Sequence, residues 1–302
     1  MSGQPRPIII FDTNGINKLA KDPESEVLRV GLRMAFFVRL TFTNIEEIIA
    51  TTEATLRRNL LAYVRSVLTA GECIDRYNSI IEQLIRNFES DPKSFDWRLV
   101  PIRSRAAEEE IVRHEVTDSF AHEQWQGARN AQKRFHNTYS SARRQFDSFF
   151  QKECRERPTI PELIEHRKRS GAFWRVCIGR YNRVANQAGD EETIRQFYAA
   201  CPSFRASILA SYVAEYERCV RDEKAGVSYR SGLQDLYSAV YLPYCNDFIT
   251  DDKKQARCLA AIATEGNLDV NVRSYEDFRN GLMGWKSDSE IPKWVPGQKS
   301  AT

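Results

Sequence analysis

Four large apolar residues, Ile8–Phe11, lead directly into the acidic residue Asp12 near the start of the chain. Three of the four are β-branched, which is typical of a short strand that is buried on both faces. A buried carboxylate without a partner is destabilising, so a buried strand needs a reason to end in one. We therefore expect Asp12 either to cap a helix or to bind a cation.

Further strand-like segments lie near both ends of the chain. Phe36–Phe42 predicts a second buried strand, and Asp247–Thr250 predicts a third, followed by a helix that stops at Gly266. Leu268–Phe278 predicts an alternating strand that turns into a last helix. Strands that alternate with helices predict an α/β fold with a parallel sheet covered on both faces.

The middle of the chain differs from its ends, because apolar residues between about residues 51 and 230 recur every three or four positions and no strand pattern is evident. The first amphipathic stretch is interrupted near Gly71. We predict a discontinuous α/β domain formed by residues 1–50 and 231–285, a large all-helical insertion over residues 51–230, and an extended tail over residues 286–302.

The overall charge does not identify a binding partner. The formal net charge is +3, from 44 basic and 41 acidic residues, which is too balanced to indicate a nucleic-acid-binding protein. The helical insertion nevertheless holds 30 Lys and Arg against 25 Asp and Glu, so the basic excess lies there.

Two further patterns bear on the location of the protein. The chain lacks an apolar run of the roughly 18 to 20 residues needed to cross a bilayer, and its N-terminus does not resemble a signal peptide. The seven cysteines are scattered and form no CxxC pair, which disfavours a disulfide framework or a zinc site. We expect a cytoplasmic protein that makes no contact with a membrane.

Acidic residues accompany the first three predicted strands of the α/β domain. Open parallel sheets bind ligands beyond the carboxyl ends of their strands, where these residues would converge. Two carboxylates about 4 Å apart repel by about 4 kcal/mol at an effective dielectric constant of about 20, and a hard divalent cation removes that cost. Such ions can activate water for attack on phosphorus. The acidic residues are Asp12, Glu46, Glu47, Asp235, Asp251 and Asp252.

Neighbouring pairs of acids leave two assignments open. Thr43 and Glu46 have the spacing of a capping box, which predicts a structural role for Glu46 and leaves Glu47 for the cation. Asp251 and Asp252 are adjacent, and either could be the last ligand. Glu46 and Asp251 therefore remain alternates.

Four segments carry a resemblance to a known family. "IIIFDTNGIN", "LTFTNIEEI", "GLQDLYSAVYLPYCNDFITDDKKQ" and "VNVRSYEDF" occur in the order and setting of a PIN domain, the fold of a family of metal-dependent ribonucleases. The "FDTN" segment resembles the opening motif of the family, and "TDD" resembles its late motif of Thr, any residue and Asp. The resemblance covers both ends of the chain but not the long middle, which simple members lack.

The resemblance implies a fold and an activity. The fold would be a PIN-like three-layer α/β/α domain with a central parallel sheet, interrupted here by the helical insertion. The activity would be hydrolysis of phosphodiesters to leave a 5′ phosphate and a 3′ hydroxyl. One or two Mg²⁺ or Mn²⁺ ions would be held by Asp12, Glu47, Asp235 and Asp252, with Asn14 and Thr250 as supporting residues. Apart from the resemblance, Asp247 is a further acid near the edge of the predicted sheet, where it would act outside the ligand set.

Basic and aromatic residues are mixed in two segments of the insertion, a composition that is compatible with a site for single-stranded nucleic acid. The competing interpretation is a charged outer face over buried aromatic residues. The basic residues singled out in these segments are Lys133, Arg134, Arg143, Arg144, Arg167, Lys168, Arg169, Arg180 and Arg183.

The function predicted from these patterns is that of a metal-dependent endoribonuclease, with a toxin or anti-phage role suggested by family analogy. The alternatives are a nuclease acting on single-stranded DNA and a non-catalytic PIN-fold scaffold or binding protein. An inhibitory or regulatory protein partner and a homo-oligomer are both compatible with these patterns.

Overall fold

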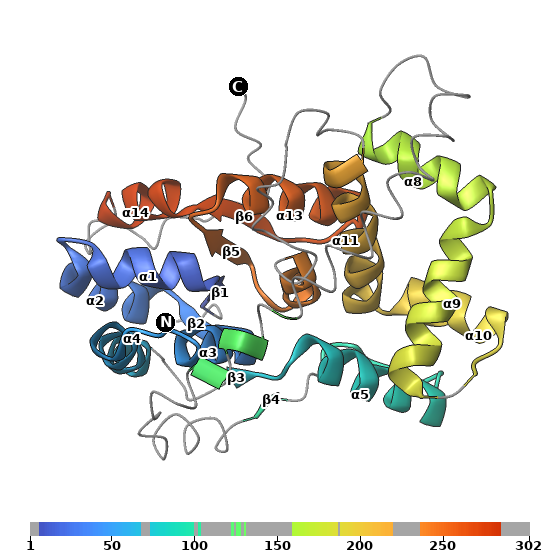
Figure 1. The fold of residues 1–302 in the computed structure, drawn as a ribbon, viewed down its shortest axis with the longest axis horizontal. Coiled ribbons are helices and arrows are strands. Elements are labelled where there is room, and N and C mark those ends of the chain that lie inside the picture. Colours follow the sequence, from blue (N-terminus) through green and yellow to red (C-terminus); the bar gives the residue numbers. More distant parts are fainter. Residues whose placement is uncertain are drawn as a thin grey trace, which may run out of the picture.

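The computed structural model of the protein describes residues 6–67, 73–99, 102–103, 122–123, 125–127, 130, 159–186, 188–219 and 236–284. Within these residues the chain forms one sheet with helices packed around it (Figure 1). No helix in these ranges is long and apolar enough to cross a membrane.

The sheet has the strand order β4-β3-β2-β1-β5-β6. Neighbouring strands run parallel, except that β3 and β4 are antiparallel. Ile9 of the central strand β1 lies opposite Val38 of β2 on one side and Asp247 of β5 on the other. The predicted α/β class is therefore confirmed. The strands are β1 (Ile8–Phe11), β2 (Phe37–Thr41), β3 (Cys73–Ile74), β4 (Ile102–Arg103), β5 (Asp247–Thr250) and β6 (Asn271–Ser274).

Two of these strands correct the prediction that residues 51–230 are all helical. Both β3 and β4 lie in that range, and β3 extends the parallel part of the sheet beside β2. Each is two residues long, which is too short to show the period-two pattern of a strand. β3 owes its conformation to pairing with β2 and to the burial of Cys73 and Ile74.

Several predicted helices are confirmed. The stretch after residue 51 forms α4 and α5, with β3 between them in the chain, and α13 follows β5 and ends before Gly266. The helices are α1 (Thr13–Lys21), α2 (Ser25–Ala35), α3 (Phe42–Ile49), α4 (Ala54–Val67), α5 (Tyr77–Ser90), α8 (Ile160–Arg169), α9 (Ala172–Ala185), α10 (Glu191–Ala200), α11 (Pro202–Cys219), the 3-10 helix η1 (Ser238–Tyr244), α13 (Lys253–Glu265) and α14 (Tyr275–Met283).

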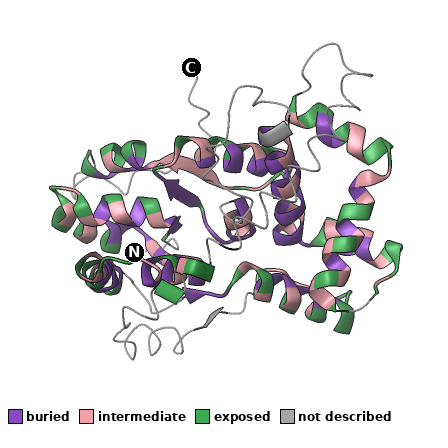
Figure 2. Ribbon diagram, in the orientation of Figure 1, coloured by how far each residue is buried: buried purple, intermediate pink, exposed green. Residues whose placement is uncertain are grey.

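Helices cover both faces of the sheet, as the buried strand residues require. Ile9 and Phe11 belong to a core cluster shared with residues of α1, α2, α3, α4 and α14. Ile10, which points to the opposite face, belongs to a second cluster shared with α5, α8 to α11, η1 and α13. Buried residues accordingly lie along β1, β2 and β5 and on the inner sides of these helices (Figure 2). Helices from the 51–230 range thus share a core with the central strand.

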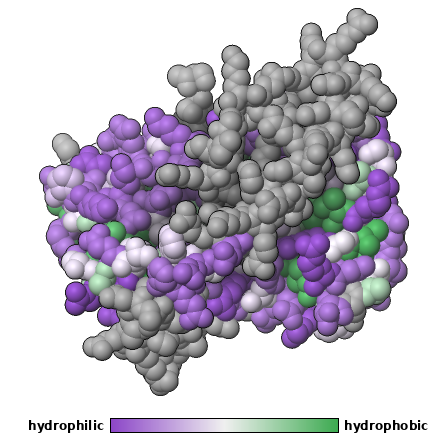
Figure 3. All heavy atoms as spheres, viewed as in Figure 1, coloured by the Kyte–Doolittle hydropathy of each residue, from purple (hydrophilic) through white to green (hydrophobic). Residues whose placement is uncertain are grey.

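The outer surface of the described helices is largely hydrophilic over α1 and α14, and hydrophobic residues gather beside α9 (Figure 3). Val176 of α9 is among the exposed large hydrophobic residues. Single exposed apolar residues of this kind are normal on a protein surface.

Candidate active site

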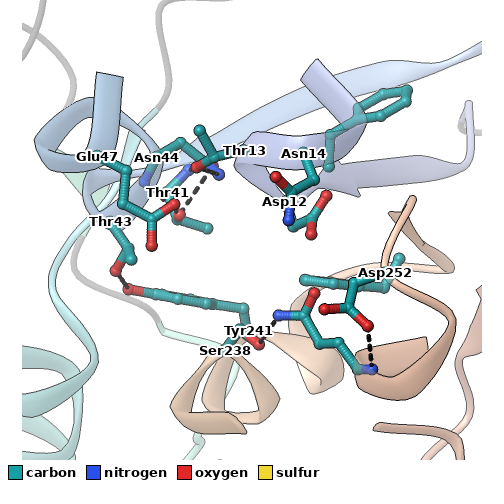
Figure 4. A pocket seen from close by; sticks show the side chains of 13 residues that line it. Asp12, Thr13, Asn14, Thr41, Thr43, Asn44, Glu47, Ser238, Tyr241 and Asp252 are labelled. Atoms are coloured by element: carbon teal, nitrogen blue, oxygen red, sulfur yellow. Dashed lines mark hydrogen bonds between the residues drawn. The ribbon is translucent and has the colours of Figure 1, made fainter. Parts of the chain in front are cut away.

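A cavity of about 270 Å³ lies at the carboxyl ends of β1, β2 and β5. Strand order in the sheet reverses around β1, and such a switch point is where open α/β sheets bind ligands. Asp12, Glu47 and Asp252 point toward the cavity from three different elements (Figure 4). The lining residues are Phe11, Asp12, Thr13, Asn14, Thr41, Thr43, Asn44, Glu47, Ser238, Tyr241, Phe248, Asp252 and Gln255.

Asp12 follows β1, and its carboxylate both caps a helix and faces the cavity. Its Oδ1 caps α1 by accepting a hydrogen bond of 2.6 Å from the backbone N–H of Gly15. Its Oδ2 accepts a bond of 2.6 Å from the hydroxyl of Thr250. The residue is only 8% exposed, and this burial raises the pKa of the carboxyl to about 6, with smaller contributions from the nearby charges of Asp252 and Asp251.

Thr250 ends β5 and links three groups around the cavity. Its hydroxyl contacts Asp12 Oδ2 and, at 2.8 Å, Oε1 of Gln255, while the backbone N–H of Asp252 donates to it at 3.1 Å. Thr250 is fully buried, so these protein groups fix its orientation. Thr250 therefore holds the Asp12 carboxylate in position.

Asp252 and Asp251 face different surroundings. Oδ1 of Asp252 caps α13 by accepting from the backbone N–H groups of Lys254 and Gln255, and its side chain lines the cavity. Asp251 lies outside the lining, and its Oδ2 is 3.4 Å from Nζ of Lys18 on the surface. The geometry therefore favours Asp252 over Asp251 as the residue that would contact an ion in the cavity.

The start of α3 corrects the predicted capping box of Thr43 and Glu46. The cap is Thr41, whose hydroxyl accepts a hydrogen bond from the N–H of Asn44, while Asn44 Oδ1 accepts from the N–H of Thr41. Strand β2 ends at Thr41 and the helix begins at Phe42, which places the box two residues earlier than expected. The hydroxyl of Thr43 lies within the helix, 2.9 Å from the hydroxyl of Tyr241.

Glu46 and Glu47 are also separated by the structure. The carboxylate of Glu46 forms an ion pair of 2.7 Å with Arg76, and Glu46 is not part of the cavity lining. Glu47 is exposed and its side chain points into the cavity (Figure 4). The predicted role of Glu46 as half of a capping box is wrong, and Glu47, the residue preferred from the sequence, is the one of the two that lines the cavity.

Three further predicted residues occupy different places. Asn14, in the first turn of α1, lines the cavity. Asp247 begins β5, at the opposite end of that strand from Thr250, and its Oδ1 lies 2.7 Å from Nε of Arg273. Asp235 lies outside the described residues, so its position relative to the cavity is a prediction from the sequence.

The predicted basic residues divide among several settings. Arg167 pairs with Glu215, and Arg169 Nε lies 3.4 Å from Glu165 Oε1. Lys168 is exposed on the same helix, α8. Outside the described residues lie Lys133, Arg134, Arg143 and Arg144.

The two basic residues of α9 that were singled out from the sequence differ from each other. Arg183 is exposed, whereas the guanidinium of Arg180 lies 4.9 Å from the ring centroid of Tyr237, the residue before Ser238 of the cavity. Of the basic residues that the structure describes, Arg180 is therefore the predicted one with a direct contact next to the cavity.

The donors of the cavity suit a hard divalent cation, because carboxylates and an amide oxygen are the ligands that Mg²⁺ and Mn²⁺ prefer. Within the described residues, no three His, Cys, Asp or Glu side chains lie close enough together to hold a metal ion. Asp12 and Asp252 are the pair best placed to share one, and Glu47 faces them across the cavity. Mg²⁺ commonly keeps several waters, which allows a more distant carboxylate to act through one of them.

Comparisons of the chain with protein-family models, curated proteins and solved structures gave no match. The function must therefore be inferred from the cavity itself.

Several lining residues were not singled out from the sequence. Tyr241 and Ser238 reach the cavity from η1, and Gln255 reaches it from the first turn of α13. The Gln255 amide contacts both Thr250 and, at 3.5 Å, the hydroxyl of Ser238. The position of Gln255 near the cavity was predictable from the sequence, because a residue three positions after a helix cap places its side chain beside that cap.

Proposed function

We propose that this protein is a PIN-like, metal-dependent endoribonuclease whose active site is the cavity at the carboxyl ends of β1, β2 and β5. The observation that carries the proposal is the convergence of Asp12, Glu47 and Asp252 on one cavity from three separate elements. The pKa of Asp12 is raised mainly by burial of its carboxyl group and to a smaller extent by the nearby charge of Asp252, and carboxyl groups with a raised pKa in a cavity are typical of functional sites.

Different side chains of the cavity would bind the ion, position a ligand and contact the substrate. Asp12 and Asp252 would hold Mg²⁺ or Mn²⁺, while Thr250 keeps the Asp12 carboxylate in place through its 2.6 Å hydrogen bond. When bound, such an ion supplies positive charge for phosphate oxygens and lowers the pKa of a water. Asn14 offers an exposed amide at the rim for a substrate oxygen.

Cleavage of labelled RNA, with Mn²⁺ or with EDTA, tests this proposal. The wild-type protein should cut RNA only with the ion and leave a 5′ phosphate. Asp12→Asn and Asp252→Asn should each lower the rate by at least about 100-fold, because each removes a charge from the ion. Single-stranded DNA of the same sequence separates a ribonuclease from the alternative DNA nuclease.

Two matched controls sharpen the assay. Asp251→Asn removes the neighbouring acid that pairs with Lys18, and Glu46→Gln removes the neighbour of Glu47 that pairs with Arg76. Both should cleave at close to the wild-type rate. Equal cleavage by wild type, Asp12→Asn and Asp252→Asn would show that the site is elsewhere, and no cleavage under any condition would favour a non-catalytic scaffold.

A further inference from the structure

Two tyrosines and an arginine contact one another beside the cavity, and a second arginine directly precedes one of the tyrosines in the chain. We call these four residues the rim cluster: Arg76, Tyr77, Arg180 and Tyr237. The rings of Tyr77 and Tyr237 are stacked with their centroids 4.8 Å apart and their planes 21° from parallel. The guanidinium of Arg180 lies 4.9 Å from the centroid of the Tyr237 ring. The cluster therefore joins α5 and α9 to the segment that leads into η1.

The chain places the rim cluster next to the cavity on two sides. Tyr237 directly precedes Ser238, which lines the cavity. Arg76 pairs at 2.7 Å with Glu46, which directly precedes the cavity residue Glu47. The rim cluster therefore adjoins the cavity lining at two points, through Tyr237 and through the partner of Arg76.

The cluster has donors that suit a phosphate backbone. The Arg76 side chain is 47% exposed while it contacts both Glu46 and the ring of Phe42. One Nη of Arg180 donates to Asn78 Oδ1 at 2.9 Å, and its buried Nε has no hydrogen-bond partner among the described residues. Guanidinium groups of this kind bind phosphate oxygens. A buried N–H without an acceptor, such as that of Arg180, lowers the stability of the protein unless a ligand supplies one.

Stacked aromatic rings beside arginines suit unpaired nucleotides better than a duplex. Bases of a single strand can stack on tyrosine rings, whereas the faces of bases inside a double helix are already covered. Tyr77 and Tyr237 are both only partly buried, so the cluster retains exposed aromatic surface.

We propose that the rim cluster binds the nucleotide next to the one whose phosphodiester enters the cavity, and so selects single-stranded over double-stranded nucleic acid. This inference rests on the proposed nuclease function and names the substrate class of the same site. The alternative is that the cluster has only a structural role, in which its side chains pack α5 and α9 against the residue that precedes η1.

Binding measured without cleavage tests the proposal. Fluorescence anisotropy in EDTA would use a labelled single-stranded RNA of about 12 nucleotides and a paired duplex of the same sequence. Wild type should prefer the single strand. Arg180→Ala and Tyr237→Leu should each weaken that binding by about tenfold, and Arg180→Ala should reduce the slope of log affinity against log salt by about one.

Matched variants separate binding from structure. Tyr237→Phe keeps the ring and should bind like wild type, and Arg180→Lys keeps the charge and should keep the salt slope. Arg175→Ala removes an exposed arginine from the same helix, α9, and should leave affinity unchanged. Thermal melting of each variant reports any loss of folding.

Three results would overturn the proposal: unchanged affinity in folded Tyr237→Leu or Arg180→Ala, equal losses in Arg175→Ala, or no preference for the single strand. A lower melting temperature with wild-type affinity would assign the cluster a structural role alone. Failure of the proposed nuclease function would appear separately, as intact binding in EDTA without cleavage after Mn²⁺ is added.

Discussion

The hydroxyl of Thr250 carries one proton but faces two oxygen atoms, Asp12 Oδ2 at 2.6 Å and Gln255 Oε1 at 2.8 Å. It can donate to only one of them at a time. If the side chain of residue 12 carried a hydrogen, it could donate a hydrogen bond to the Thr250 hydroxyl. The Thr250 hydroxyl could then donate to Gln255, and all three side chains would have a partner. When Asp12 is ionised and no cation is bound, this arrangement therefore lowers the stability of the folded protein.

The substitution Asp12→Asn should therefore stabilise the metal-free protein above neutral pH. Burial raises the pKa of Asp12 from 3.8 to about 6, so its contribution to stability is fully present below about pH 3.8 and is lost as the pH rises through about 6. Urea unfolding in EDTA should show the Asp12→Asn variant more stable than wild type at pH 8 by up to about 3 kcal/mol, with a smaller difference at pH 5. A variant less stable than wild type at pH 8 would contradict this.

Gly15 allows the first turn of α1 to approach β5. A Cβ at this position would lie 3.0 Å from both Asp12 Oδ1 and the carbonyl oxygen of Ile249. Gly15→Ala should lower the free energy of unfolding by about 1 to 3 kcal/mol, because backbone and a capped side chain would have to move. Gly179→Ala is the matched control in α9, where a Cβ meets nothing within 4 Å, and should stabilise by about 0.5 to 1 kcal/mol.

At the level of elements, Asn44 joins the end of β2 to the start of α3. Its Oδ1 accepts hydrogen bonds from the N–H of Thr41 at 3.0 Å and from the Thr41 hydroxyl at 2.8 Å. Asn44→Ala would leave both buried donors without that acceptor and should cost about 2 to 3 kcal/mol of unfolding free energy. Glu46→Ala, at a partly exposed position of the same helix, should cost less than about 1 kcal/mol. Similar losses in chemical unfolding would restore Glu46 as a capping residue.

Elements with a long or repeated pattern were predictable from the sequence. The run Ile8–Phe11 and the helix that ends before Gly266 each carry a signal several residues long. The two-residue strand Cys73–Ile74 carries none, because its conformation depends on β2. Thr41 and Thr43 are both good caps, and the choice between them depended on where β2 ended.

The candidate site was predictable where acids follow strands. Asp12 follows β1 directly and Asp252 lies two residues beyond β5, so both were predictable from their positions at strand ends. Tyr241 lies in a 3-10 helix that contains Pro243, and its place in the cavity depends on packing between segments far apart in the chain. Such packing leaves no local pattern.

The whole molecule should unfold as one cooperative unit, because residues of the 51–230 range share a core with the sheet. Ile74 of β3 is fully buried in the same cluster as Ile10 of β1. Ile74→Ala should lower the free energy of unfolding by about 3 kcal/mol in a single transition. Val27→Ala, at an exposed position of α2, should change it by less than about 0.5 kcal/mol. Two separate thermal transitions would instead show an independent insertion.

The proposed activity depends on one property of the molecule, which is that Asp12 and Asp252 together bind a divalent cation. Calorimetric titration of metal-free protein with Mn²⁺ measures this directly. We predict binding by wild type and by Asp251→Asn, and affinity at least about tenfold weaker for Asp12→Asn and Asp252→Asn. Equal Mn²⁺ affinity in all four proteins, or no binding by wild type, would contradict the account.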